Sequence, residues 1–193
     1  MTQSQPARPV HMTITDPKVM RAMAHPARVA ILEYLTNGPE ATATECAQVV
    51  GLSPSATSYH LRALAKVGLV QEAPSRGDGR ERVWRGSISG YRIDTDDVTS
   101  PEALSAATAL VDVVLSRDDR LAREFLEHAN EEPREWYDAA GLTRNQLLMT
   151  AQELADLHEQ VAQLMKPYHR STRTDPPLGA RRVTAMFRAF PAD

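Results

Sequence analysis

Residues Leu52–Val70, "LSPSATSYHLRALAKVGLV", carry the strongest pattern in the chain. Read at helical spacing, this stretch has two different faces. One face is suited to burial against a core and consists of Thr57, Leu61, Leu64 and Ala65. The other face carries hydroxyls, one phenol and two cations, from Ser55, Ser58, Tyr59, Arg62 and Lys66. The pattern predicts an amphipathic helix that follows a Ser53 cap and ends at Gly68, with a polar face that must have a use.

The neighbouring segments predict a helix-turn-helix followed by a hairpin. Two helices are expected upstream, in "TDPKVMRAMAHP" and in "PARVAILEYLTNGP", where Gly38 and Pro39 stop the second one. The short segment "ATATECAQVVGL" predicts a helix that is capped by Thr42 or Thr44 and closed by Gly51. Downstream, two strand-like runs flank residues 76–80, "RGDGR", and an Asp-Gly pair between extended runs is a strong signal for a hairpin.

This order of elements gives the polar helix face a function. In a helix-turn-helix, the second helix enters the major groove of DNA while the first crosses the backbone. Hydroxyls and Arg62 can contact base edges or phosphates, and arginines at a hairpin tip are suited to phosphates. A solvated face is the simpler explanation for one amphipathic helix alone, but the helix, the hairpin and three tip arginines together favour DNA. The predicted DNA-binding residues are Ser55, Ser58, Tyr59, Arg62, Lys66, Arg76, Arg80 and Arg82.

Three segments, "AHPARVAILEYL", "LSPSATSYHLRALAKVGLV" and "GRERVWR", resemble the winged helix-turn-helix of bacterial ArsR-type repressors. The resemblance covers residues 16–88, and "S-x-H-L-x-x-L-x-x-x-G-L-V" is its most specific part. It implies a homodimer bound to an inverted repeat in double-stranded DNA, as an autoregulating or local repressor. Residues 91–193, with "EWYDAAGL", "LLMTAQELADLHEQ" and "GARRVTAMFRAFP", resemble the C-terminal half of a larger, poorly characterised subgroup. That second resemblance leaves open whether a small-molecule effector binds there.

One departure from the family bears on metals. The metal sensors of the family carry a Cys-x-Cys pair where this chain has Thr42 and Thr44, and hydroxyls are poor ligands for soft metals. Cys46 falls on the apolar face of its helix and is interpreted as a small buried residue. We therefore expect no metal site and no cofactor.

The histidines of the chain favour structural roles. His128, His158 and His169 lie among acidic residues, but they lack the spacing that places two ligands on one helical face. His25 precedes Pro26 and is expected to cap or pack at a helix junction, and His60 is expected to support its helix.

We expect a mainly α fold with a small β component and three parts. Residues 1–15 form an N-terminal arm or a short strand, 16–90 the winged helix-turn-helix, and 91–193 a helical region for dimerisation. Residues 89–102 are interpreted as a linker, and a helix follows from Pro101 to about Asn130. This helix is apolar nearly all round at Ala103–Leu115, and a later helix has an apolar seam, which predicts a subunit contact. Short strands are expected at "NQLLM" and "RRVTAMFRAFP".

Charge and composition narrow the class of protein. The formal net charge is −3, but residues 1–90 carry ten Lys/Arg against seven Asp/Glu, and residues 91–168 carry seven against sixteen.

The single cysteine excludes an intramolecular disulfide. No secretory signal or membrane-spanning run is visible, so a cytoplasmic protein without a membrane partner is expected. We find no Ser/His/Asp order, catalytic carboxylate pair or phosphate loop, so no enzyme activity is predicted. The rival hypothesis is a winged-helix protein-interaction module that does not bind DNA.

Overall fold

The computed structural model describes residues 12–76, 81–94, 100–169, 173 and 175–192. The chain divides into two compact units, one with residues up to Val114 and His169–Thr174, and one with Leu115–Tyr168 and Asp175–Asp193. The elements in chain order are β1 (Met12–Ile14), α1 (Pro17–Met23), α2 (Pro26–Asn37), β2 (Ala41–Thr42), α3 (Ala43–Val50), α4 (Pro54–Lys66), β3 (Val70–Ala73), β4 (Val83–Gly86), β5 (Tyr91–Ile93), α5 (Pro101–Glu127), η1 (Ala129–Glu131), α6 (Arg134–Ala139), α7 (Ala151–Met165) and η2 (Lys166–Tyr168).

Local side-chain caps begin the helices of the first unit where the sequence predicts. The Asp16 carboxylate accepts a hydrogen bond from the Lys18 backbone N–H at the start of α1. Of the two candidate caps for α3, Thr42 is the cap, and it forms a reciprocal capping box with Glu45. Each of these bonds joins residues two or three positions apart, so the sequence alone was sufficient to predict them.

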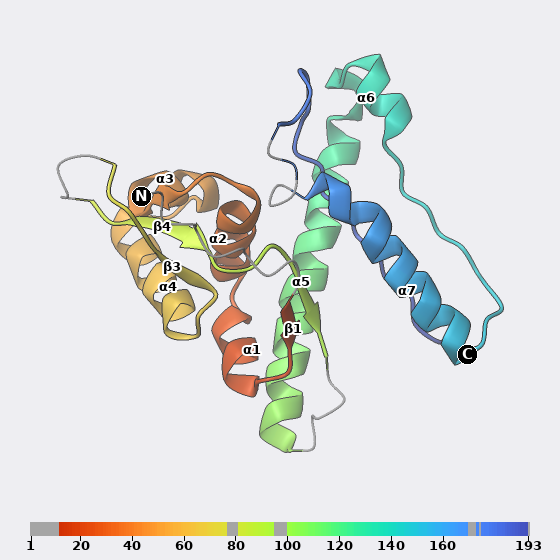
Figure 1. Cartoon of the computed structure of the whole chain (residues 1–193), viewed down its shortest axis with the longest axis horizontal. Helices are drawn as coiled ribbons and strands as arrows, with labels where there is room; N and C mark the ends of the chain where they lie inside the picture. The colour runs from red at the N-terminus through yellow and green to blue at the C-terminus, as the bar shows by residue number, and fades with distance from the viewer. Residues whose placement is uncertain (1–11, 77–80, 95–99, 170–172, 174, 193) are drawn as a thin grey trace, which may run out of the picture. The chain divides into compact units, whose positions relative to one another are not determined.

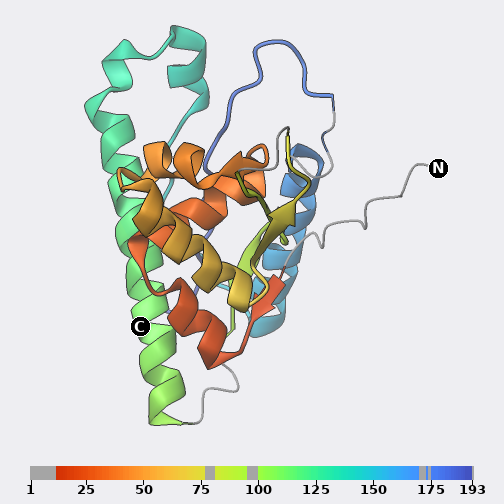
Figure 2. The same cartoon turned by 90° about the vertical axis from the view of Figure 1, so that its left-hand side faces the viewer.

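Helices α2, α3 and α4 pack against one another beside the β3–β4 hairpin (Figures 1 and 2). The apolar face of α4 is turned into this core, as predicted, with Thr57, Leu61 and Leu64 fully buried. Burial of this face against α2 and α3 fixes the rotation of α4 about its own axis, and therefore decides which residues it presents to solvent.

A three-stranded antiparallel sheet in the order β2-β4-β3 forms the wing. The two strands predicted around the Asp-Gly pair are confirmed, with Val70 opposite Gly86 and Ala73 opposite Val83. The turn itself, residues 77–80, lies outside the described residues. The sheet packs closely on α2, because a Cβ added at Gly86 would lie 2.9 Å from the Thr36 Cα.

The segment interpreted as a linker, residues 89–102, contains a strand instead. Strand β5 pairs in parallel with β1, with Met12 opposite Tyr91 and Ile14 opposite Ile93. The short strand expected near residues 10–15 is thus confirmed over Met12–Ile14. The linker interpretation was wrong over Tyr91–Ile93 because the partner strand is far away in the sequence, where no turn signal reveals the pairing.

The first unit also includes the beginning of α5. Ala103, Ala106, Ala107 and Leu110 are buried there, and the last three belong to the core cluster of the first unit. One apolar stripe of this helix, which was expected to be apolar nearly all round, is therefore used within the chain. The other stripe is not, since Leu104 is 59% exposed and Leu115 is 37% exposed.

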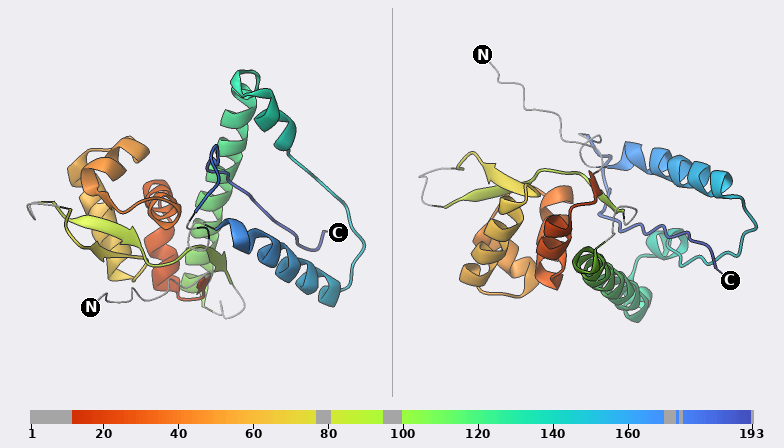
Figure 3. Two further views of the ribbon diagram at one scale, coloured as in Figure 1. Left: turned by 45° about the horizontal axis from the view of Figure 1, so that its top comes forward. Right: turned by 90° about the horizontal axis from the view of Figure 1, so that it is seen from below.

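The second unit is helical, with extended segments before and after α7 (Figure 3). A capping box between Thr150 and Glu153 begins α7. The strands expected at residues 145–149 and 181–191 are wrong, because both segments lack strand pairing and carry exposed side chains such as Leu148 and Phe190. A run of apolar residues forms a strand only where a neighbouring backbone pairs with it. Within the described ranges, no helix is both long and apolar enough to cross a membrane.

Candidate nucleic-acid interface

The turn between α3 and α4 sets the direction in which α4 leaves the core. Gly51 closes α3 with a left-handed φ of 66°, a conformation that glycine adopts without steric cost. Two residues later, the Ser53 hydroxyl accepts a hydrogen bond from the Ala56 backbone N–H at 3.2 Å and begins α4. The chain therefore forms a tight helix-turn-helix, with α4 as its second helix.

The outer face of α4 is polar and free of carboxylates. Tyr59 is 58% exposed, and Ser55, Arg62 and Lys66 are also exposed. Helix α4 contains no Asp or Glu, and the side chains of Arg62 and Lys66 make no hydrogen bond or ion pair within the described part of the chain. A surface with cations that have no internal partner is suited to an anionic ligand such as a phosphate backbone.

Ser58 differs from the other members of this predicted face because it is only partly exposed. It occupies the edge of the face, next to the buried Thr57. The Thr57 hydroxyl donates back to the Ser53 carbonyl at 3.0 Å, which satisfies a polar group inside the core. The two-faced pattern of the sequence is thus confirmed, with Ser58 at its boundary.

The inner side of the exposed Tyr59 ring rests on a polar cluster that joins three helices. His60 is 8% exposed, and its Nδ1 accepts a hydrogen bond from the Arg28 Nε–H at 3.4 Å. The His25 Nδ1 accepts from the Ala27 backbone N–H and caps α2, which confirms the capping role predicted for His25. The supporting role predicted for His60 is also confirmed. Burial lowers the pKa of His60, and the electrostatic effect of the neighbouring His25 and Arg28 side chains lowers it further.

Arg28 is a residue that the sequence reasoning missed. Its guanidinium lies 6.0 Å from the centroid of the Tyr59 ring, and its Nη1–H donates to the Ala22 carbonyl at 2.8 Å. A signal was available, because Arg28 is the single cation in the otherwise mostly apolar helix of residues 26–37. The sequence does not show, however, that Arg28 contacts Tyr59 and His60, which lie about 30 positions further along the chain.

Two of the three wing arginines, Arg76 and Arg82, have internal partners. The Arg76 Nη1–H donates to the Glu45 carboxylate at 3.1 Å, and the Arg82 Nη1–H donates to Glu72 at 2.9 Å. All four side chains remain substantially exposed, so these pairs contribute little to stability and can be exchanged for phosphate contacts. Arg80, the third arginine of the prediction, lies outside the described residues.

Of the two threonines found where the metal sensors of the resembled family carry cysteines, Thr42 has a structural role and Thr44 is exposed. The Thr42 hydroxyl accepts from the Glu45 backbone N–H, so it serves as a helix cap. Cys46 is fully buried, and burial raises the pKa of its thiol to about 11. Among the described residues, no cluster of three or more His, Cys, Asp or Glu side chains could hold a metal ion.

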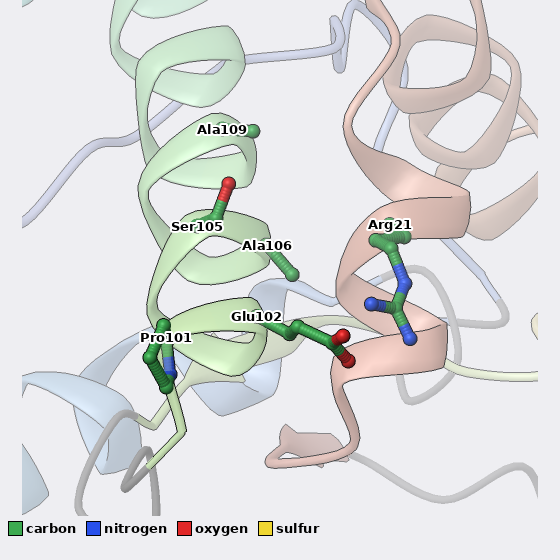
Figure 4. Close-up of a pocket in the computed structure, with 6 residues that line it drawn as sticks. All are labelled: Arg21, Pro101, Glu102, Ser105, Ala106 and Ala109. Atoms are coloured by element: carbon green, nitrogen blue, oxygen red, sulfur yellow. The ribbon is translucent and has the colours of Figure 1, made fainter.

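A shallow pocket of about 560 Å³ lies between α1 and α5 in the first unit (Figure 4). It is lined by Arg21 of α1 and by Pro101, Glu102, Ser105, Ala106 and Ala109 of α5. Figure 4 shows the side chains of Arg21 and Glu102 pointing toward one another across it. None of the predicted DNA-binding residues lines this pocket, so it is separate from the outer face of α4.

Comparisons with known proteins agree with this geometry. Residues 25–72 match the model of the arsR family of bacterial regulatory proteins. The HTH-type transcriptional regulator YgaV of Escherichia coli is 42% identical over 52 residues, which are 27% of this chain and 52% of that protein. The HTH-type transcriptional regulator NmtR of Mycobacterium tuberculosis is 43% identical over 51 residues, which are 26% of this chain and 42% of that protein. The chain thus spans about half the length of the curated relatives it matches.

A solved structure is also similar to part of the chain. It is the solution structure of a homodimeric winged helix-turn-helix DNA-binding domain from Mycobacterium bovis, with 24% identity and a TM-score of 0.33. The match covers 55% of this chain and 81% of that one. The match of residues 25–72, the α3–α4 turn and the β3–β4 wing together place this part of the chain in the ArsR family of bacterial regulatory proteins, as its winged helix-turn-helix domain.

Proposed function

We propose that the protein is a DNA-binding transcription regulator that represses genes by occupying an inverted-repeat operator as a homodimer. The observation that carries this proposal is the carboxylate-free outer face of α4, on the second helix of a helix-turn-helix. The relatives over this region are both named as transcriptional regulators. A protein of this function acts where the DNA is, which fits the expected cytoplasmic location.

The proposed interface has two kinds of contact. Arg62, Tyr59 and Ser58 lie toward the middle of α4, where side chains reach base edges, and they would supply sequence preference. Ser55 and Lys66 near its two ends, and Arg76, Arg80 and Arg82 on the wing, would hold phosphates and supply affinity for any DNA. The exposed ion pairs of Arg76 and Arg82 are weak enough to open when a phosphate competes for the guanidinium.

The proposed homodimer rests on apolar side chains that the chain itself does not cover. On α5, Leu104 and Leu115 remain exposed, although the opposite stripe of the same helix is buried. In the second unit, Leu164 of the predicted α7 seam is 72% exposed and Tyr168 is 69% exposed. A two-fold dimer would cover such surfaces with identical surfaces of a second copy, and would place two α4 helices about 34–36 Å apart on DNA.

The experiment that tests the proposal is selection of DNA from a random pool by the full-length chain, followed by gel-shift titration of the selected sequence. We expect an inverted repeat, and we expect Arg62→Ala to weaken binding to it. Arg120→Ala is the matched control, because Arg120 is an exposed arginine on another helix, where it pairs with Glu124. Failure to enrich any sequence would instead favour a protein-interaction module. Sedimentation showing a monomer at micromolar concentration, with and without DNA, would contradict the dimer.

A further inference from the structure

Arg28 reaches from the start of α2 to two other helices of the helix-turn-helix domain. Its Nη1–H donates to the Ala22 carbonyl in α1 at 2.8 Å. Its Nε–H donates to the His60 Nδ1 in α4 at 3.4 Å. Because these two bonds use donors with fixed relative directions, they restrict both the position and the tilt of the planar guanidinium.

The same guanidinium supports the exposed Tyr59 ring. The Arg28 Cζ lies 6.0 Å from the centroid of the Tyr59 ring, within the range of a cation–π contact. The His60 ring meets Tyr59 edge-on, with centroids 5.5 Å apart and an interplanar angle of 68°. Tyr59 therefore presents its outer side to solvent, while its inner side rests on two groups that are themselves held.

The imidazole rings beneath Tyr59 have defined hydrogen-bond roles. The Nδ1 atom of His60 accepts from Arg28, and the Nδ1 atom of His25 accepts from the Ala27 backbone N–H at 3.1 Å. An accepting nitrogen carries no proton, so each neutral ring carries its proton on Nε2. The two rings lie 4.5 Å apart, which packs His60 against the N-terminal cap of α2. Arg28 thus binds an acceptor that is itself fixed by the fold.

We propose that Arg28 is a positioning residue for DNA recognition, which fixes the Tyr59 ring so that its phenol meets DNA in one orientation. The inference rests on the proposed function, in which Tyr59 lies on the DNA-reading face. An exposed aromatic side chain that is held before binding loses less conformational entropy when it makes its contact. Arg28 therefore contributes to the preference for one sequence over another and not to the affinity for DNA in general.

A double-mutant cycle in the full-length chain tests this role. The parent, Arg28→Ala, Tyr59→Ala and the double variant are titrated with the selected operator and with random DNA of the same length. In the parent background, we expect Arg28→Ala to reduce the operator-to-random affinity ratio by about tenfold, as for the loss of one specific contact. In the Tyr59→Ala background, we expect the same change to alter the ratio by less than about twofold, because the ring that Arg28 supports is already absent.

Conservative variants distinguish positioning from a general effect on charge or folding. Arg28→Lys keeps the charge but has no planar fork for both acceptors, so we expect a reduced ratio as in Arg28→Ala. His60→Asn keeps a hydrogen-bond acceptor near the Nδ1 position, so we expect most of the operator-to-random affinity ratio to remain. His60→Leu has no acceptor for Arg28, so we expect the ratio to fall. Each variant is compared well below its own unfolding temperature, so that a loss of stability does not count as a loss of recognition.

Four outcomes would overturn the inference. Equal losses on operator and random DNA, with a shallower salt dependence, would mean that Arg28 contacts a phosphate itself. Equal losses in the presence and absence of Tyr59 would mean that Arg28 acts without it. An unchanged operator-to-random affinity ratio in Arg28→Lys would mean that a positive charge at this position is sufficient for recognition, without the planar guanidinium. A parent protein that prefers no sequence overturns the proposed function as well, and this failure is distinguishable because it is present before any substitution is made.

Discussion

Truncation to alanine should affect different properties at two adjacent residues of α4: protein stability at Leu61 and operator binding at Arg62. Leu61 is fully buried in the core, and Leu61→Ala removes three carbon atoms, which at about 0.8 kcal/mol per buried group costs about 2.4 kcal/mol. Leu32 and Leu35 of α2 belong to the same core cluster and are also fully buried, so the cavity left behind adds about 1 kcal/mol. We therefore expect Leu61→Ala to reduce the free energy of unfolding by about 3–4 kcal/mol.

Arg62→Ala should change the free energy of unfolding by less than about 0.5 kcal/mol, because Arg62 is exposed and alanine is a good helix former. It should instead weaken operator binding by about 1–3 kcal/mol, as for a specific base contact. The contrast tests the assigned rotation of α4 about its axis, and not only the presence of a helix.

The assay for this pair is urea unfolding followed by tryptophan fluorescence. The chain has two tryptophans, so a Trp136→Phe background leaves Trp84 as the single reporter. Trp84 lies in β4 and is 4% exposed, so its emission follows the unfolding of the first unit. A loss of less than about 1 kcal/mol in Leu61→Ala, together with a larger loss in Arg62→Ala, would mean that the two faces are assigned the wrong way round. Full operator affinity in Arg62→Ala would refute the proposed reading face even if the stability results agree.

Four further predictions concern DNA binding by Arg80 of the wing, the stability of the protein at low pH, the reactivity of the Cys46 thiol and the close contact of Gly86 in β4 with α2. Arg80→Ala, in the undescribed wing turn, should weaken operator and random DNA by similar factors and reduce the slope of log K against log salt by about 0.9 per subunit; a loss on operator alone would mean that the wing reads bases. Because burial lowers the pKa of His60 below the ordinary histidine value of about 6.5, the unfolded chain binds the proton first, so stability should be complete above about pH 6.5 and fall as the pH drops below it. Unfolding curves across pH 5–8 should show less of this fall in His60→Asn, and an equal fall would contradict the assignment. Cys46, with its pKa raised to about 11, should react with a thiol reagent at pH 8 only as fast as the fold opens; rapid reaction in the native protein would contradict its burial. Gly86→Ala should lower stability by about 1–3 kcal/mol, since its Cβ would meet the backbone of α2, and a neutral result in unfolding measurements would show that the strand can shift.

The helix boundaries and the two faces of α4 could be predicted from the sequence because the interactions that set them are local. The bond from the Ala56 N–H to the Ser53 hydroxyl spans three positions, as do those of the capping box between Thr42 and Glu45. The alternation of buried and exposed residues on α4 follows from the helical period. Packing of the apolar face against the core then orients the helix about its own axis. Most of the candidate reading face, with Tyr59 and Arg62 exposed, was available at this level.

Tertiary structure decided the features that depend on residues far apart in the chain. Three such features join partners that no local pattern specifies. They are the pairing of β1 with β5, the ion pairs of Arg76 with Glu45 and of Arg82 with Glu72, and the support of Tyr59 by Arg28. The strands expected at residues 145–149 and 181–191 were wrong for the same reason. Short apolar runs of this kind have only a preference for extended backbone, and a strand forms where a second backbone supplies the matching donors and acceptors. Sequence thus determined which side chains α4 presents, while packing of distant helices against one another determined what holds them there.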